Sequence, residues 1–192
     1  MTVRILGISG SVRRPSRTTT LVAQLTDRIA RALGGTGEVI ELVDAAPHLL
    51  SALERDGLGE IGRDLIRRIE TADALVVGTP VYRASYTGAL KHLFDLVDHR
   101  ALSGRPVVLA ATGGSTLHGL VTEHQLRPLL SFFGALTLPT TLYATEADFE
   151  NYELTDPAIA ARVERAAREA AQLIEAQRRA PTSAPAPIAI GG

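Results

Sequence analysis

The fold is decided by residues 74–88, ALVVGTPVYRASYTG, in which a short apolar run ends abruptly in a polar segment with two tyrosines. Residues 74–78 are almost wholly apolar, which is typical of a central parallel strand covered on both faces. Residues 79–88 break this pattern and lead into a segment with helical spacing of apolar residues. We therefore predict a strand–loop–helix unit, the repeating element of a parallel α/β sheet.

The same alternation continues on both sides of this unit. Apolar runs predict further strands at residues 3–9, 39–43, 106–111 and 136–142, the last interrupted by Pro139 and so placed at a sheet edge. Helices are predicted over residues 18–33, 60–71, 87–98, 117–133 and 156–178, whereas residues 45–62 are interpreted as irregular up to that second helix. These segments predict one α/β domain, residues 1–179, with a five-stranded, doubly wound parallel sheet and helices on both faces. The Pro/Ala-rich residues 180–192 are expected to form a disordered tail.

The composition narrows the classes of function. The 20 Lys and Arg residues against 21 Asp and Glu residues give a net charge of -1, which argues against a general nucleic-acid binder. The absence of cysteine excludes disulfides, thiolate catalysis and cysteine-ligated metals, and the five histidines show no metal-binding spacing. No apolar stretch reaches about 18 residues, and no signal peptide is visible. We therefore expect a cytoplasmic protein that uses no metal, nucleic acid or membrane.

The segment after the first predicted strand, residues 9–20 (SGSVRRPSRTTT), combines hydroxyl groups with arginines at the start of a helix. Free backbone N–H groups and the helix dipole favour an anion at such a position. Arg13, Arg14 and Arg17 can add charge-assisted hydrogen bonds, so a phosphate monoester suits this chemistry. The alternative is a helix-capping cluster with solvated arginines, since helix starts prefer Ser and Thr in any case.

Two further strand ends carry unusual loops. Residues 79–88 contain Pro80 and the flat rings of Tyr82 and Tyr86, and residues 112–115 (TGGS) contain paired glycines that let the backbone approach a ligand closely. Ordinary packing of the tyrosines and a turn that requires positive φ are the alternatives. Ligands of open parallel sheets bind outside the carboxyl ends of the strands. We therefore predict a phosphate at the first loop and a planar ring between the other two, as in a mononucleotide such as FMN.

Two common nucleotide motifs are missing. The chain has no GxGxxG and no GxxxxGK[ST], so neither a Rossmann dinucleotide site nor a P-loop is supported. Glu41 and Asp44 follow the second predicted strand, where an acid can bind a ribose. Without the glycines we interpret both as surface residues.

Three motifs carry a resemblance to the NADPH-dependent FMN reductase family. They are GISGSVRRPSRTTTL (residues 7–21), GTPVYRASYTGALKHLFDL (residues 78–96) and ATGGSTLHGL (residues 111–120). The resemblance runs from about residue 3 to residue 175 and implies the flavodoxin-like form of the fold. It places the FMN phosphate against Ser9, Ser11, Arg13, Ser16 and Thr18. The ribityl chain and the ring would lie against Pro80, Val81 and Tyr82. The isoalloxazine edge would be held by Thr112, Gly113, Gly114 and Ser115.

The chain is most similar in its motifs to the flavin reductases that serve alkanesulfonate and methanesulfonate monooxygenases. Many other family members have Asn at the positions of Thr18 and Arg83, and these departures weaken an assignment to the quinone and chromate reductases. In the sulfonate-linked subgroup, the helix after TGG often carries an extra residue that forms a π-helical turn at a tetramer contact. His124 stands at the corresponding place, and the alternative is a plain surface histidine.

The resemblance implies NAD(P)H-dependent reduction of FMN, with hydride passing from NADPH or NADH to the flavin, and a reduced flavin supplied to a partner monooxygenase. The flavin carries this chemistry, so no catalytic side chain or metal is expected. Arg83 is a candidate for attracting the nicotinamide nucleotide's phosphates, and a homodimer or homotetramer is implied. The alternatives are a quinone, azo or chromate reductase with tightly bound FMN, a flavodoxin-like electron carrier, and a non-catalytic module on the same fold.

Overall fold

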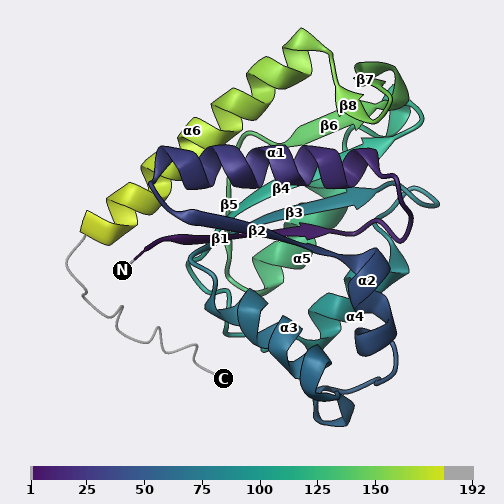
Figure 1. The fold of residues 1–192 in the computed structure, drawn as a ribbon, viewed down its shortest axis with the longest axis vertical. Helices are drawn as coiled ribbons and strands as arrows, with labels where there is room; N and C mark the ends of the chain where they lie inside the picture. Colours follow the sequence, from purple (N-terminus) through teal and green to yellow (C-terminus); the bar gives the residue numbers. More distant parts are fainter. Residues whose placement is uncertain (1, 180–192) are drawn as a thin grey trace, which may run out of the picture.

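The computed structural model describes residues 2–179 of the chain, which form a central sheet between two layers of helices (Figure 1). Within these residues the main sheet has six strands, and every pairing is parallel. The strands are β1 (Arg4–Ser9), β2 (Thr36–Glu41), β3 (Ala74–Pro80), β4 (Pro106–Gly113), β5 (Leu136–Thr137) and β6 (Leu142–Thr145). Their order, β2-β1-β3-β4-β5 with β6 also beside β4, is the flavodoxin-like order, so the predicted fold class is confirmed.

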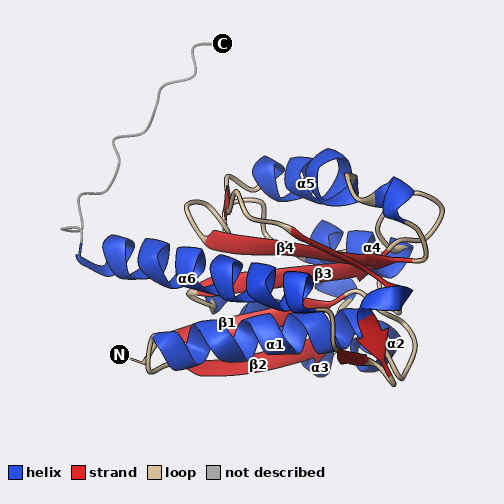
Figure 2. Cartoon of the chain, turned by 90° about the horizontal axis from the view of Figure 1, so that it is seen from above, coloured by secondary structure: helices blue, strands red, loops and turns tan. Residues whose placement is uncertain are grey.

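Helices cover both faces of this sheet, as Figure 2 shows from above. The helices α1 (Arg17–Ala32) and α6 (Pro157–Arg179) lie on one face. The opposite face carries α2 (Leu42–Leu49), α3 (Glu60–Thr71), α4 (Gly88–Leu96) and α5 (Arg127–Phe132). Each face buries its own apolar cluster, which explains why the central strands are apolar on both sides.

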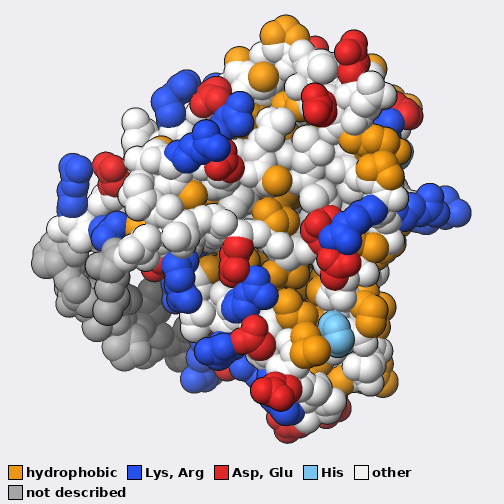
Figure 3. Space-filling view, in the orientation of Figure 1, with side chains coloured by type: hydrophobic (Ala, Val, Ile, Leu, Met, Phe, Trp, Pro, Cys, Tyr) orange, Lys and Arg blue, Asp and Glu red, His pale blue; other side chains and the backbone are white. Residues whose placement is uncertain are grey.

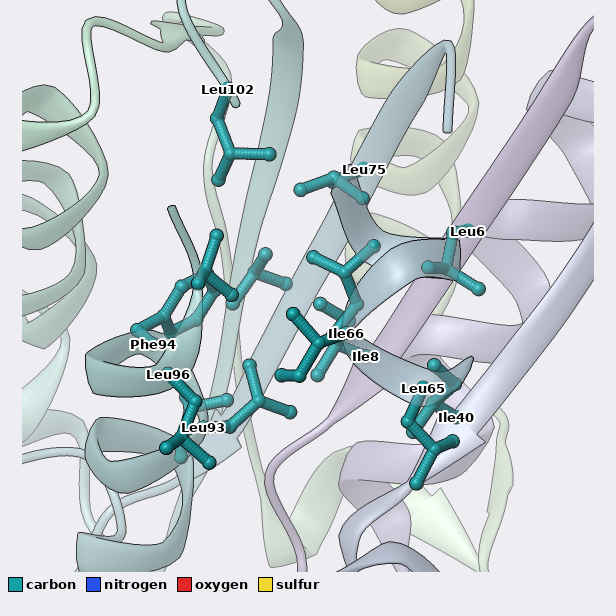
Figure 4. Packing of buried hydrophobic residues seen from close by; sticks show 14 of the residues in the cluster. Leu6, Ile8, Ile40, Leu65, Ile66, Leu75, Leu93, Phe94, Leu96 and Leu102 are labelled. Carbon is teal, nitrogen blue, oxygen red and sulfur yellow. The ribbon is translucent and has the colours of Figure 1, made fainter. Parts of the chain in front are cut away.

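The larger cluster shows how the helices are held on the second face. Ile8 and Leu75 of the sheet pack with Ile66 of α3 and Phe94 of α4 (Figure 4). Phe94 is 1 % exposed, and its ring also contacts Phe133 at a centroid distance of 5.8 Å. This packing anchors α4, and therefore the loop between β3 and α4 that precedes it.

The prediction of an irregular segment over residues 45–62 is wrong in its first part. The chain forms α2 directly after β2, with Pro47 inside the helix, and then a 3₁₀ turn at Arg55–Gly57. Leu42, Ala45 and Leu49 are buried on one side of α2. Burial of this apolar side outweighs the hydrogen bond that the proline removes.

The predicted single strand over residues 136–142 is also wrong, because it is split into β5 and β6. Both pieces pair with β4, at residues 106–107 and 110–113. Pro139 has no N–H to donate between them. Thr140 instead donates from its N–H and its hydroxyl to Glu169 of α6, at 3.3 and 2.7 Å.

The predicted long helix over residues 117–133 is not one regular α-helix, because three helix types follow one another here. They are a 3₁₀ turn at Thr116–His118, a π-helix at Thr122–Leu126 and α5. Pro128 lies at the start of α5, where it has no N–H to donate to the preceding turn. The π-helix lies directly before it, and His124 is the central residue of that π-helix.

A short hairpin between β6 and α6 has no counterpart in the predicted elements. It pairs β7 (Phe149–Glu150) with β8 (Glu153–Leu154) through a turn at Asn151 and Tyr152. Both turn residues have positive φ, 47° and 68°, a conformation that costs non-glycine residues energy. Strands of two residues are too short to produce an alternating pattern that the sequence could reveal.

The proposed disordered tail, residues 180–192, lies outside the described residues.

Candidate functional site

The three loops singled out in the sequence meet in one cavity at the carboxyl ends of β1, β3 and β4. Its volume is about 330 Å³. These strand ends lie around the point where the strand order reverses, which is where open α/β sheets bind ligands. The lining residues are Ser11, Arg13, Pro15, Ser16, Arg17, Thr18, Pro80, Val81, Tyr82, Thr112, Gly113, Gly114, Glu146 and Tyr152.

A larger hollow of about 640 Å³ lies elsewhere, between α4 and α5. Phe94, Phe132 and Phe133 contribute to its lining, and the loops at the strand ends do not. Size alone would favour it as the site. The smaller cavity has the polar groups and the position that ligand binding to this fold requires, and we therefore assign the site there.

The first loop presents buried hydroxyls and a helix N-terminus to the cavity. Ser16 caps α1 by accepting a hydrogen bond from Thr19 N, at 3.2 Å, and the N–H groups of Arg17 and Thr18 have no acceptor within the helix. Ser11 and Thr18 are 5 % and 2 % exposed. No acidic residue lies in the first turn of α1. This arrangement favours an anion with several oxygens.

The three arginines of the first loop have different surroundings. Arg14 forms ion pairs with Glu41 and Asp44, at 2.7 and 2.5 Å, and its hydrogen bond to Glu41 raises its pKa above the ordinary value. This pairing turns Arg14 away from the cavity and also accounts for Glu41 and Asp44 as surface partners. Arg13 and Arg17 line the cavity. Elsewhere, too, basic and acidic side chains lie next to one another on the face shown in Figure 3.

The second loop is held by a tight turn. Tyr82 and Ser85 exchange backbone hydrogen bonds of 2.9 and 3.1 Å, and Arg83 and Ala84 between them have positive φ of 51° and 65°. Non-glycine residues adopt such a conformation at a cost, and strained turns cluster at ligand sites. The turn leaves Tyr82 39 % exposed at the cavity, with its ring available for contact.

The third loop keeps its backbone accessible. A side chain at Gly114 would meet no atom within 4 Å, so ligand atoms can approach its backbone. Gly113 is closed from the other side, because a Cβ there would lie 2.2 Å from the hydroxyl of Tyr143. That hydroxyl donates to Ser115 O at 2.5 Å, and burial raises the pKa of Tyr143.

Hydrogen bonds join the three loops to one another. The hydroxyls of Thr18 and Thr112 lie 2.6 Å apart, and Val81 N donates to Thr112 O at 2.8 Å. Thr87, the N-cap of α4, donates from its hydroxyl to Gly10 O at 2.8 Å. The cavity is therefore held in shape by its own backbone and hydroxyl groups.

Ten of the twelve residues expected to bind the flavin line this cavity, and Ser9 and Ser115 do not. Ser9 is fully buried, and its hydroxyl bonds to that of Thr19 at 2.8 Å. The Ser115 hydroxyl accepts from Leu117 N and caps the 3₁₀ turn. Both serines support the loops from behind.

His124 lies outside this cavity and is exposed. It lines a small hollow of about 160 Å³ together with His118, Leu117 and Leu120. The π-helix is nevertheless connected to the site, because Ser85 donates from its hydroxyl to Gln125 Oε1 at 3.1 Å.

Four lining residues were not among the expected binding residues: Pro15, Arg17, Glu146 and Tyr152. The sequence offered a reason to expect Arg17 at the site, since it lies in the arginine-containing loop. No local pattern in the sequence pointed to Glu146 or Tyr152. They lie in the 3₁₀ turn at Glu146–Asp148 and in the turn of the β7–β8 hairpin, which folding brings to the cavity. Only folding brings that segment beside α1.

The donor set fits a flavin mononucleotide. Buried hydroxyls, two arginines and a helix N-terminus suit a phosphate, and Arg17 Nε is a buried donor without a hydrogen-bond partner among residues 2–179. The open backbone at Gly114 and the ring of Tyr82 suit a planar heterocycle. No helix within residues 2–179 is long and apolar enough to cross a membrane.

Known proteins resemble this chain over most of its length. The family model for NADPH-dependent FMN reductases matches residues 3–150. The chain is 48 % identical to an FMN reductase (NADPH) of Pseudomonas aeruginosa, over 88 % of this chain and 91 % of that protein. It is 51 % identical to an NADH-dependent FMN reductase of Pseudomonas fluorescens, over 89 % of this chain and 91 % of that protein.

Solved structures show the same likeness. An oxidoreductase from Corynebacterium diphtheriae superposes with a TM-score of 0.82 at 33 % identity, covering 91 % of this chain and 98 % of that one. An archaeal flavodoxin, at 11 % identity and a TM-score of 0.62 over 92 % and 99 % of the two chains, shares the fold alone. From the matched residues and the curated relatives, the chain belongs to the NADPH-dependent FMN reductase family.

Proposed function

We propose that this protein is an NAD(P)H:FMN oxidoreductase, a flavin reductase that binds FMN in the cavity at the carboxyl ends of β1, β3 and β4. The observation that carries the proposal is the meeting of an anion site and an open glycine backbone in one cavity of about 330 Å³. Family membership and relatives named as FMN reductases support the same activity.

The first loop would hold the phosphate. Ser11, Ser16 and Thr18 offer hydroxyls, Arg13 offers a guanidinium, and the first turn of α1 offers unpaired N–H groups. Charge-assisted bonds of this kind are the strongest that a surface cavity can provide. They fix one end of the ligand and thereby orient its other end.

The second and third loops would hold the ribityl chain and the ring. Pro80, Val81 and Tyr82 border one side, and Thr112, Gly113 and Gly114 border the other. When bound, FMN supplies the chemistry by accepting a hydride from the nicotinamide. The protein's contribution is to hold the ring in place and leave one side of it open to the nucleotide.

Release of reduced flavin to a monooxygenase belongs to the same proposal. Most residues that line the cavity offer polar groups, and its anion site is only partly enclosed, since Arg13 is exposed. These features suit a flavin that enters and leaves. We further propose a cytoplasmic homo-oligomer in which the π-helix around His124 lies at a contact between subunits, next to the loop that carries Tyr82.

Steady-state oxidation of NADPH and NADH with added FMN, FAD or riboflavin tests the proposal. We expect nicotinamide oxidation that depends on added FMN, and a preparation that loses its flavin on gel filtration. Retention of yellow FMN through gel filtration, with turnover of quinones or azo dyes, would instead indicate a reductase with a resident cofactor. No oxidation of either nicotinamide in the presence of FMN would overturn the assignment.

A further inference from the structure

One acidic side chain borders the cavity in which the phosphate is proposed to bind. Glu146 is the only acidic residue of the described chain in the cavity lining, and its carboxylate forms an ion pair with Nη2 of Arg17 at the start of α1. The side chain of Arg17 is 30 % exposed, and that of Glu146 is 71 % exposed. A carboxylate at this place neutralises a cation that a phosphate would otherwise use.

Arg17 is not fully engaged by this ion pair. The ring of Tyr152 lies 5.0 Å from Arg17 Cζ, which fixes the guanidinium by a cation–π contact. Its Nε is buried and has no hydrogen-bond partner within residues 2–179. Arg17 is thus a positioned cation with a spare donor, beside the hydroxyls of Ser16 and Thr18.

Glu146 is held near Arg17 by the fold. The 3₁₀ turn that begins with it is closed by a capping box, in which Thr145 N donates to the Asp148 carboxylate at 2.6 Å and the Asp148 N–H donates to the Thr145 side chain. The Thr145 hydroxyl also donates to Asp148 Oδ2, at 3.0 Å. The following hairpin is tied to α1, because Thr20 donates from its hydroxyl to Tyr152 O at 2.9 Å. The segment that carries Glu146 is therefore placed against the helix N-terminus.

We propose that Glu146 competes with the phosphate of FMN for Arg17, and so weakens the hold on phosphorylated flavin and speeds its release. This inference rests on the proposed function and names a residue that shortens the time for which the flavin stays bound. A carboxylate beside the phosphate site repels a phosphate dianion, and the ion pair occupies part of the Arg17 guanidinium that the phosphate would use. The remaining donors of the first loop still bind the phosphate, so the effect is on affinity.

The inference makes a prediction about ligand selectivity. Glu146 competes only with the phosphate, which riboflavin lacks. Removing the carboxylate of Glu146 therefore changes the affinity for FMN and leaves the affinity for riboflavin unchanged. If Glu146 instead had a structural role, such as stabilising the 3₁₀ turn, its replacement would change the affinities for FMN and riboflavin in parallel. The ratio of the two dissociation constants therefore separates the two roles.

The test is a titration of FMN and riboflavin by fluorescence quenching, with FMN dissociation rates from stopped flow. The variants are Glu146→Gln, Arg17→Gln and the double variant. The matched control is Glu164→Gln, since Glu164 of α6 forms an ion pair with Arg28 of α1 outside the cavity. Thermal unfolding of each variant checks that the fold is intact.

We expect Glu146→Gln to bind FMN about fivefold more tightly and to release it more slowly, the effect of removing one partly exposed charge interaction. Arg17→Gln should weaken FMN binding by about tenfold, the loss of one charged hydrogen bond. In the double variant the gain from Glu146→Gln should disappear. Riboflavin affinity should stay constant in all of these, and Glu164→Gln should match the unchanged protein.

Unchanged or weaker FMN binding by Glu146→Gln, or an equal gain for riboflavin, would overturn the inference while leaving the proposed function intact. Failure of the unchanged protein to bind FMN would overturn both. NAD(P)H oxidation with FMN, measured on the same preparations, shows which of the two has failed.

Discussion

Thr18 in the first turn of α1 and Thr112 at the end of β4 place their hydroxyl oxygens 2.6 Å apart beside the cavity that both residues line. The two residues are 2 % and 7 % exposed. The bond joins the loop proposed to bind phosphate to the loop proposed to bind the ring edge. A buried hydroxyl that loses its partner keeps the full cost of its desolvation, which makes this pair open to test.

Thr18→Val and Thr112→Val should each lower the free energy of unfolding by about 1–3 kcal/mol, because each leaves one buried hydroxyl unpaired. The double variant removes both hydroxyls with little change in volume. We therefore expect its loss of unfolding free energy to be smaller than the sum of the losses in the two single variants. Urea unfolding of all four proteins measures this coupling. Strict additivity would contradict a direct bond between the pair.

Arg13 and Arg14 are neighbours with opposite expected effects. Arg13 lines the cavity, whereas Arg14 is held by Glu41 and Asp44. Arg13→Gln should weaken FMN binding by about tenfold through the loss of a charged hydrogen bond. Arg14→Gln should leave FMN affinity unchanged. Fluorescence titration of both variants measures the difference, and equal losses would show that the two guanidinium groups act in common.

Gly113 and Gly114 should respond differently to alanine. A Cβ at Gly113 would lie 2.2 Å from the hydroxyl of Tyr143, so the ring must move and its bond to Ser115 O is lost. We expect Gly113→Ala to cost about 1–3 kcal/mol of stability by overpacking. A Cβ at Gly114 would meet no atom within 4 Å, so that variant should unfold like the unchanged protein. Thermal and urea unfolding compare the pair.

Glu123 in the π-helix should make stability depend on pH. Arg127 Nε donates a hydrogen bond to Glu123 Oε2 at 2.6 Å. This bond holds the pKa of Glu123 below its ordinary value of 4.5. A depressed carboxyl pKa contributes stability above the unfolded value, and that contribution is lost as the pH falls through the folded value. Glu123→Gln should therefore be less stable at pH 7.

The difference between that variant and the unchanged protein should shrink as the pH falls through about 4.5, where the carboxyl of the unfolded chain is half protonated, and on through the lower pKa of the folded protein. Urea unfolding at several pH values from 7 to 3.5 measures the difference. A difference that is independent of pH would mean that the charge of Glu123 does not stabilise the fold.

The alternation of apolar runs with helical spacing was enough to predict the sheet class and most helices. The predicted helix over residues 60–71 has the same bounds as α3, because its buried positions, Leu65, Ile66 and Ile69, repeat at helical spacing. Elements with weaker local signals were not predicted correctly. The strand at residues 136–142 is split, and the β7–β8 hairpin was missed.

By itself the sequence determined that three unusual loops follow parallel strands, and hence that they share one end of the sheet. Only the tertiary structure decided which side chains of those loops face the cavity. Arg13 and Arg14 are adjacent in the same loop, and the carboxylates of Glu41 and Asp44 turn one of them aside. Glu146 reaches Arg17 across 129 residues of chain. Local patterns record burial and periodicity, whereas the direction of a charged side chain depends on partners that folding brings beside it.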